Sequence, residues 1–81
     1  MEIRKIAGPV RDFGRITLHL REVMEANGVK RGSLAEAMDV RFEVVDRWYN
    51  GELNRIDGEI LAKLCYVLDC EVADILKYEK P

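Results

Sequence analysis

The sequence has no long apolar run, because charged and polar residues interrupt every hydrophobic stretch. A membrane-spanning helix needs about 18 or more consecutive apolar residues, so the sequence predicts no such helix. Met1 to Lys5 are not followed by a long apolar segment either, and we therefore expect no secretory signal peptide. The expected location is the cytoplasm.

Cysteine and histidine are also scarce, with two cysteines and one histidine in 81 residues. Cys65 and Cys70 are five positions apart, which fits neither a zinc site nor a disulfide framework. Cys65 is expected in the core, with both thiols reduced. His19 has no second histidine or nearby cysteine with which to form a metal site or a catalytic triad. Gly28 and Gly32 do not fit a phosphate-binding loop. The sequence therefore predicts no metal, no cofactor and no enzymatic activity, and no small-molecule effector is evident in it.

Basic residues are not in excess, since 13 Lys and Arg stand against 15 Asp and Glu for a net charge of −2. Nucleic-acid binders usually carry a basic excess. Residues 1–15 hold four basic and two acidic groups, whereas residues 52–81 hold four basic and seven acidic groups. DNA binding would therefore have to depend on locally placed positive charge.

Apolar residues recur at spacings of three and four through most of the chain, a pattern typical of amphipathic helices. The pattern predicts an all-α fold of five short helices around one core, at about residues 18–27, 31–38, 42–49, 58–68 and 72–77. Asp57 is expected to be the N-cap of the fourth helix. Asp39 lies in the turn between the second and third helices, where a residue that tolerates positive φ is needed.

The N-terminal residues 1–15 are predicted to form an irregular arm, because Gly8, Pro9 and Gly14 interrupt any helix. Alternation in residues 2–7 allows a short strand there. Residues 16–18 fit either a second extended piece or the start of the first helix. We expect the folded domain to span residues 16–78, with residues 79–81 as a tail.

Residues 31–50 contain two short predicted helices and a tight turn. Helices joined in this way cross at a steep angle, so small and apolar residues must fill the crossing. Ala35 allows the close approach. Five larger side chains are expected to bury the joint: Leu34, Met38, Val40, Val45 and Trp48. The outer side of residues 42–49 stays polar, and the major groove of DNA, about 12 Å wide, admits one α-helix.

This pattern resembles the helix-turn-helix of the phage-repressor and Cro family of bacterial and phage regulators. The small residue Ala35, the apolar positions of the joint, and Asn50 with Gly51 carry the resemblance. Further matching positions in the last two helices are Arg55, Ile56, Leu61, Leu64, Cys65, Leu68, Asp69, Cys70, Asp74, Ile75 and Leu76. The resemblance covers roughly residues 16–78 and implies a compact, lambda-repressor-like DNA-binding domain. Asp39, where glycine is usual, and the acidic Glu43 and Asp46 depart from the family pattern.

The resemblance implies double-stranded DNA as the partner. The base-reading candidates lie on the outer face of the third helix: Phe42, Glu43 and Arg47. Arg pairs bidentately with guanine, Glu accepts from cytosine N4, and Phe contacts the thymine methyl group. The phosphate-contact candidates lie at the starts of the second and third helices and after the third helix: Arg31, Arg41, Asn50 and Arg55.

Each of these assignments has a structural alternative. Glu43 and Arg47 have the i, i+4 spacing of a helix ion pair. Phe42 could instead pack against the domain or a partner, and Asn50 could serve only as a helix end. The phosphate-contact arginines could be solvated surface residues. Asp46 is expected to be solvated or paired within the molecule.

The sequence thus predicts a sequence-specific transcriptional regulator that inserts its third helix, about residues 42–49, into the major groove. One module of this size reads few bases, so a homodimer is expected. The N-terminal segment, Val67 and Tyr78 are candidate dimer surfaces. The alternative is a protein-interaction module or antitoxin-like adaptor that keeps the fold with weak or no DNA binding. Phe42 and the acidic residues of the third helix favour this alternative.

Overall fold

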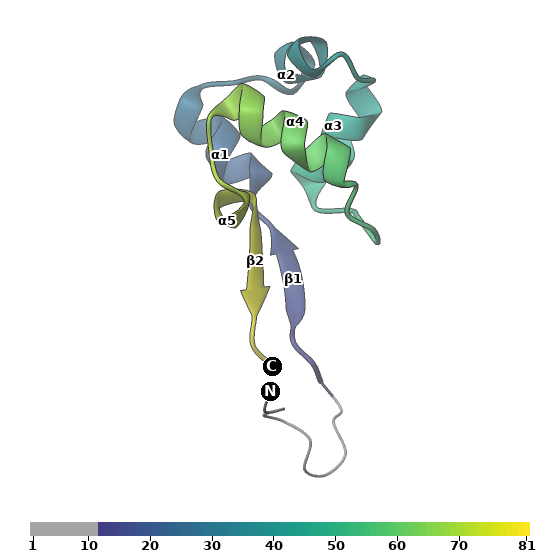
Figure 1. The fold of residues 1–81 in the computed structure, drawn as a ribbon, viewed down its shortest axis with the longest axis vertical. Coiled ribbons are helices and arrows are strands. Elements are labelled where there is room, and N and C mark those ends of the chain that lie inside the picture. The colour runs from purple at the N-terminus through teal and green to yellow at the C-terminus, as the bar shows by residue number, and fades with distance from the viewer. Residues whose placement is uncertain (1–11) are drawn as a thin grey trace.

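Five helices and two short strands follow one another along residues 12–81, the part of the chain that the computed structural model describes. The elements are β1 (Arg15–Leu18), α1 (Leu20–Asn27), α2 (Arg31–Met38), α3 (Phe42–Asn50), α4 (Gly58–Leu68), α5 (Val72–Ile75) and β2 (Leu76–Glu79). The predicted five-helix fold is confirmed, and a small antiparallel sheet is added to it (Figure 1). The strand considered for residues 2–7 lies outside the described residues.

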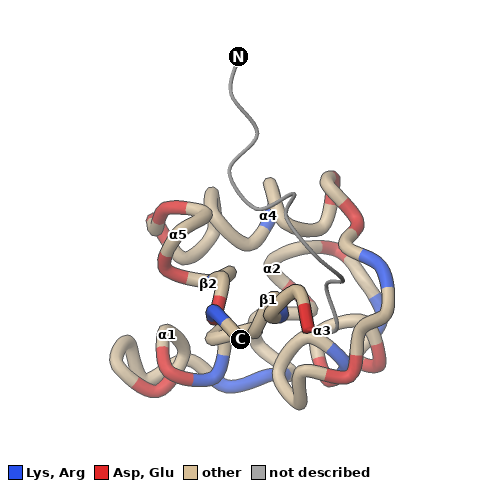
Figure 2. The backbone as a smooth tube through the Cα atoms, turned by 90° about the horizontal axis from the view of Figure 1, so that it is seen from below, with Lys and Arg blue, Asp and Glu red and all other residues tan. Residues whose placement is uncertain are grey.

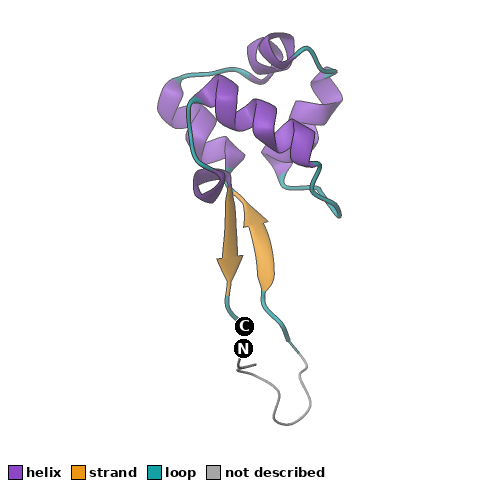
Figure 3. Ribbon diagram, viewed as in Figure 1, coloured by secondary structure: helices purple, strands orange, loops and turns teal. Residues whose placement is uncertain are grey.

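The added sheet joins the two ends of the described chain. β1 pairs with β2 in the register Arg15↔Glu79 to Leu18↔Leu76. Figure 3 shows the two strands projecting as a ribbon from the helical body. The pairing explains why α1 begins at Leu20 and not at about residue 18, and why α5 ends at Ile75 and not at about residue 77. Both strands extend one residue beyond the domain bounds of 16–78 that the sequence predicted.

Several helix ends follow directly from local sequence. Asp39 ends α2 with a φ of 55°, which confirms the expected positive φ in the turn. The Oδ1 atom of Asp57 accepts the N–H groups of Glu59 and Ile60 at 2.9 and 3.3 Å, so the predicted N-cap of α4 is also confirmed. Such a cap satisfies amide groups that have no acceptor within the helix.

All five helices contribute to one core. Its buried members are Leu20, Met24, Leu34, Ala35, Met38, Val45, Trp48, Leu64, Leu68 and Ile75. Ala35 is 5% exposed and Trp48 is 3% exposed, so the small and the large residue predicted for the α2–α3 joint are both buried. α2 packs against both α3 and α4, which holds α3 in a defined orientation on the body.

The two cysteines are free, half-buried thiols at the end of α4. The N–H of Cys70 donates to the carbonyl oxygen of Cys65 at 3.1 Å in the turn that ends this helix. Burial, reinforced by the neighbouring Cys65, raises the pKa of the Cys70 thiol to about 11. Cys70 is therefore protonated at neutral pH and a poor nucleophile.

The described residues contain no group of three or more His, Cys, Asp or Glu side chains placed to hold a metal ion. Within residues 12–81, none of the helices has the length and apolar character needed to cross a membrane.

Candidate nucleic-acid interface

The turn between α2 and α3 is closed by main-chain hydrogen bonds. The N–H of Asp39 donates to the carbonyl oxygen of Glu36 at 3.1 Å, and the N–H of Val40 donates to that of Ala35 at 3.0 Å. The half-buried Val40 packs against the core, and Arg41 then begins α3 as its N-cap residue. These contacts make α2, the turn and α3 one rigid unit.

The inner and outer faces of α3 differ sharply in exposure. Val45 and Trp48 are 0% and 3% exposed and face the core. Four residues on other sides of the helix are exposed: Phe42, Glu43, Arg47 and Asn50. Glu43, Arg47 and Asn50 follow one another at spacings of four and three, so they share one face of the helix. The structure therefore brings Glu43 and Arg47, two of the predicted base-reading residues, together on one face of α3, whereas Phe42 lies on another side of the helix beside the start of α2.

Three of the predicted contact residues border the same hollow. Arg41 and Arg47 line it together with Glu43 and Val44, and its volume is about 520 Å³. Among the salt bridges of residues 12–81, none joins Glu43 to Arg47, so the ion pair that their spacing allows is not formed. The Arg47 guanidinium is thus available to an acceptor outside the protein.

Arg31 makes a contact that the sequence did not predict for it. Its Nη1 atom donates to Oδ1 of Asp46 at 2.5 Å, which connects the start of α2 to the middle of α3. Its guanidinium carbon also lies 4.6 Å from the ring centre of Tyr49 and 5.7 Å from that of Phe42, distances typical of cation–π contacts. Asp46 is therefore paired within the molecule, one of the two arrangements expected for it.

Tyr49 is the residue of this surface that sequence reasoning missed. Arg21 of α1 approaches its ring from another helix, at 5.4 Å from the ring centre. Arg21 also donates to Glu25 at 3.1 Å, and this hydrogen bond, with Tyr49 nearby, raises the pKa of Arg21. Nothing in the linear sequence links Tyr49 to Arg21 or Arg31, because the three residues lie on three different helices.

The start of α2 faces a second hollow, with a volume of about 390 Å³. Its lining residues are Glu25, Val29, Lys30, Arg31, Gly32, Phe42 and Tyr49. Lys30, the N-cap residue, makes no side-chain capping bond, and the first turn of α2 carries no acidic residue. The first amide groups of a helix lack internal acceptors and favour an anion. The hollow thus combines free helix amides with two basic side chains, a combination suited to a phosphate group.

The remaining two predicted contact residues lie after these hollows in the chain. Asn50 is the exposed last residue of α3, and Arg55 is exposed in the loop that leads to α4. Neither borders the hollows at the starts of α2 and α3. Figure 2 shows both charge signs along α3 and acidic positions around α5, and basic residues also lie on β1, α1, α4 and β2, so the basic residues of α2 and α3 are part of a mixed surface.

The α2–turn–α3 unit, with a buried inner face and an exposed polar outer face on its second helix, is a helix-turn-helix. Residues 19–81 match the family model of the Cro/C1-type HTH DNA-binding domain, and the chain belongs to this family. The resemblance seen in the sequence is therefore confirmed, and double-stranded DNA is the partner that the family defines.

Two solved structures share the fold. One is a candidate DNA-binding protein from Bacteroides fragilis, with a TM-score of 0.69 and 16% identity, over 78% of this chain and 100% of that chain. The other is the transcriptional regulator VanUg, with a TM-score of 0.67 and 20% identity, over 91% of this chain and 99% of that chain. Identities this low establish a common fold only. A search of curated proteins returned no match.

Proposed function

We propose that the protein is a sequence-specific transcriptional regulator that inserts α3 into the major groove and acts as a homodimer. The observation that carries this proposal is the exposed outer face of α3, where Arg47 has no ion pair with another residue of 12–81 and lies opposite the buried Val45 and Trp48. A helix held in this way can enter the groove without rearrangement of the core. A dimer would double the number of bases that are read.

On this proposal Arg47 reads guanine through paired hydrogen bonds to O6 and N7. Glu43 accepts from cytosine N4, and its charge is offset by Arg41 and Arg47, which border the same hollow. Phe42, at 46% exposure, contacts a thymine methyl group.

The phosphate contacts surround this reading face. Arg31 and the free amides at the start of α2 bind one phosphate in the hollow beside Phe42 and Tyr49. Arg41, Asn50 and Arg55 contact the backbone on the other sides of α3. These contacts fix the position of the protein on the duplex and carry no sequence information.

Selection of bound duplexes from a random DNA library tests the proposal. Enrichment of a common motif is expected, and the selected duplex should bind more tightly than a scrambled duplex of the same composition. Equal binding of the two duplexes at every salt concentration would contradict groove reading.

Exposure of Phe42 and the net charge of −2 favour a second candidate function, a protein-interaction module or antitoxin-like adaptor. Such a module would use the aromatic and acidic surface of α3 to bind another protein. The selection experiment separates the two functions, because the adaptor enriches no DNA motif.

Asp46→Asn is expected to raise affinity for selected and scrambled DNA by a similar factor. Asn has nearly the same shape and still offers an oxygen to Arg31, but the substitution removes a negative charge from the DNA-facing surface. The salt dependence of binding should steepen by up to about one unit of slope, as expected when one more positive charge becomes available to phosphate. A salt titration with both duplexes measures this change.

Two variants control for the Asp46 experiment. Asp69→Asn makes the same chemical change at the exposed end of α4 and should leave the affinity close to that of the wild type. In the Arg31→Ala background, Asp46→Asn should raise affinity less, because the arginine that it frees is absent. Weaker DNA binding by Asp46→Asn alone would show that the ion pair orients Arg31 for phosphate and does not compete with it.

A further inference from the structure

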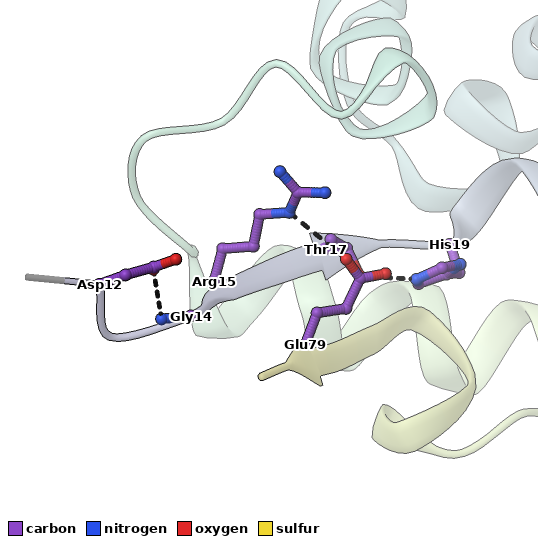
Figure 4. A network of polar contacts seen from close by, with 6 residues as sticks. All are labelled: Asp12, Gly14, Arg15, Thr17, His19 and Glu79. Carbon is purple, nitrogen blue, oxygen red and sulfur yellow. Dashed lines mark hydrogen bonds and ion pairs between the residues drawn. The ribbon is translucent and has the colours of Figure 1, made fainter. Parts of the chain in front are cut away.

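The β1–β2 ribbon has one apolar face and one polar face. Side chains alternate between the two sides of a strand, and directly paired residues share a side. The pairs Ile16↔Tyr78 and Leu18↔Leu76 therefore form the apolar face. The pairs Arg15↔Glu79 and Thr17↔Lys77 form the polar face, where Arg15 Nε donates to a carboxylate oxygen of Glu79 at 3.3 Å (Figure 4).

The apolar face is covered at its base and exposed towards its end. Leu18 and Leu76 pack against the core. Ile16 and Tyr78 are 55% and 58% exposed, and the adjacent Phe13 is 75% exposed. The hydroxyl of Tyr78 donates to the carbonyl oxygen of Phe13 at 2.6 Å, which holds the aromatic side chain along the ribbon. A two-stranded ribbon is marginally stable alone, and an exposed apolar face of this kind indicates a partner surface.

Among residues 12–81, nothing pairs with the main-chain groups at the outer edge of β2 around Tyr78. The N–H of His19 donates to the carbonyl oxygen of Ile75 at 2.7 Å, which identifies this as a hydrogen-bonded pair of the antiparallel ladder. Hydrogen-bonded pairs alternate along such a ladder, so the N–H and C=O of Tyr78 point away from β1. The N–H of Leu76, which points the same way, is already taken by the carbonyl oxygen of Val72. Tyr78 is therefore the centre of the free edge.

We propose that β2 pairs antiparallel with β2 of a second copy of this chain, with Tyr78 of both copies at the two-fold axis. In this register the outward N–H and C=O of each Tyr78 meet those of the other copy. Lys77 lies opposite the partner's Glu79, and Glu79 lies opposite the partner's Lys77. The apolar faces of both ribbons then lie on the same side of one four-stranded sheet. This interface rests on the homodimer proposed above, but strand pairing itself requires no DNA.

The choice of β2 over β1 follows from charge. Self-pairing of β1 around Ile16 would place Arg15 opposite the partner's Thr17, which offers no opposite charge. Pairing through β2 also leaves the DNA-facing surface open, since Figure 1 shows the ribbon leaving the helical body at the end away from α2. The second copy is thus favoured by a free edge, an exposed apolar face and a self-complementary charge pair.

A charge exchange tests this register by sedimentation equilibrium of the full chain. The wild type should form a reversible dimer at micromolar concentration. Lys77→Glu places two acidic residues opposite the partner's Glu79, and Glu79→Lys places two basic residues opposite each other. Each variant alone should dimerise at least about tenfold more weakly, because like charges directly opposite destabilise strand pairs. An equimolar mixture should dimerise again, since both pairs between the two β2 strands, residue 77 with residue 79 of the other copy, are then of opposite charge.

Lys63→Glu, the same substitution on the exposed side of α4, is the matched control and should dimerise like the wild type. Circular dichroism of each variant checks that the helices are intact. A wild-type monomer at all concentrations, or a mixture that remains as weak as the separate variants, would overturn the proposal. Neither result bears on groove reading, because a folded monomer would still prefer a selected half-site to a scrambled duplex.

Discussion

Arg47→Ala is expected to weaken binding to the selected DNA site by about 1–3 kcal/mol, roughly a five- to 150-fold rise in Kd. The substitution removes a side chain that is exposed on α3 and makes no salt bridge within the described part of the chain. If Arg47 pairs with guanine, the loss should be large for the selected duplex and small for a scrambled one. Preference at one base position should also relax, which a second selection with the variant would reveal.

Arg41→Ala is the matched control for this prediction, because Arg41 borders the same hollow at the start of α3. Loss of a phosphate contact should weaken binding to selected and scrambled duplexes alike and reduce the salt dependence by about one unit of slope. Exposed surface substitutions usually change stability by less than about 0.5 kcal/mol, so both variants should unfold at a wild-type urea concentration. Equal losses on both duplexes for Arg47→Ala would assign Arg47 to the phosphate backbone.

Ala35→Leu is expected to lower the free energy of unfolding by about 1–3 kcal/mol. Ala35 is 5% exposed and lies where α2 packs against α3, so three added carbon atoms must displace neighbouring side chains or separate the two helices. A domain of this size has only about 5 kcal/mol of stability to lose. DNA affinity should fall as well, because the orientation of α3 depends on the same contact.

Ala37→Leu provides the control, since Ala37 is an exposed residue of the same helix and undergoes the same substitution. It should change the urea midpoint little, because its added carbon atoms meet solvent. Indistinguishable midpoints for the two variants would show that α2 and α3 do not pack closely at Ala35.

The helices and their ends were largely predictable because their causes are local. α2 and α4 occupy the residues that apolar spacing indicated, and α3 is one residue longer than expected. Asp57 caps α4 with its own side chain, and Asp39 takes the left-handed conformation that the turn requires. Each of these features depends on residues within one or two helical turns, so a window of sequence contains the relevant interactions.

The ribbon was not predictable in the same way. β1 and β2 are each only four residues long, and their partners lie at opposite ends of the described chain. A short extended segment is stabilised mainly by the strand beside it, and no local sequence pattern indicates which segment of the chain that strand is. The apolar spacing of the last helix continues into residues 76 and 77, so the sequence predicts helix there. In the structure, pairing with β1 ends α5 at Ile75.

The sequence by itself determined the five-helix class, the buried joint of the helix-turn-helix and the exposure of Arg47 and Glu43 on α3. These properties follow from the helical period, which sets the inner and outer face of each helix. Only the tertiary structure decided that Arg31 bonds to Asp46 and lies against Tyr49, and that Ile16 and Tyr78 share one exposed face. Contacts of this kind join residues of different elements, so they exist only once packing has brought those elements together.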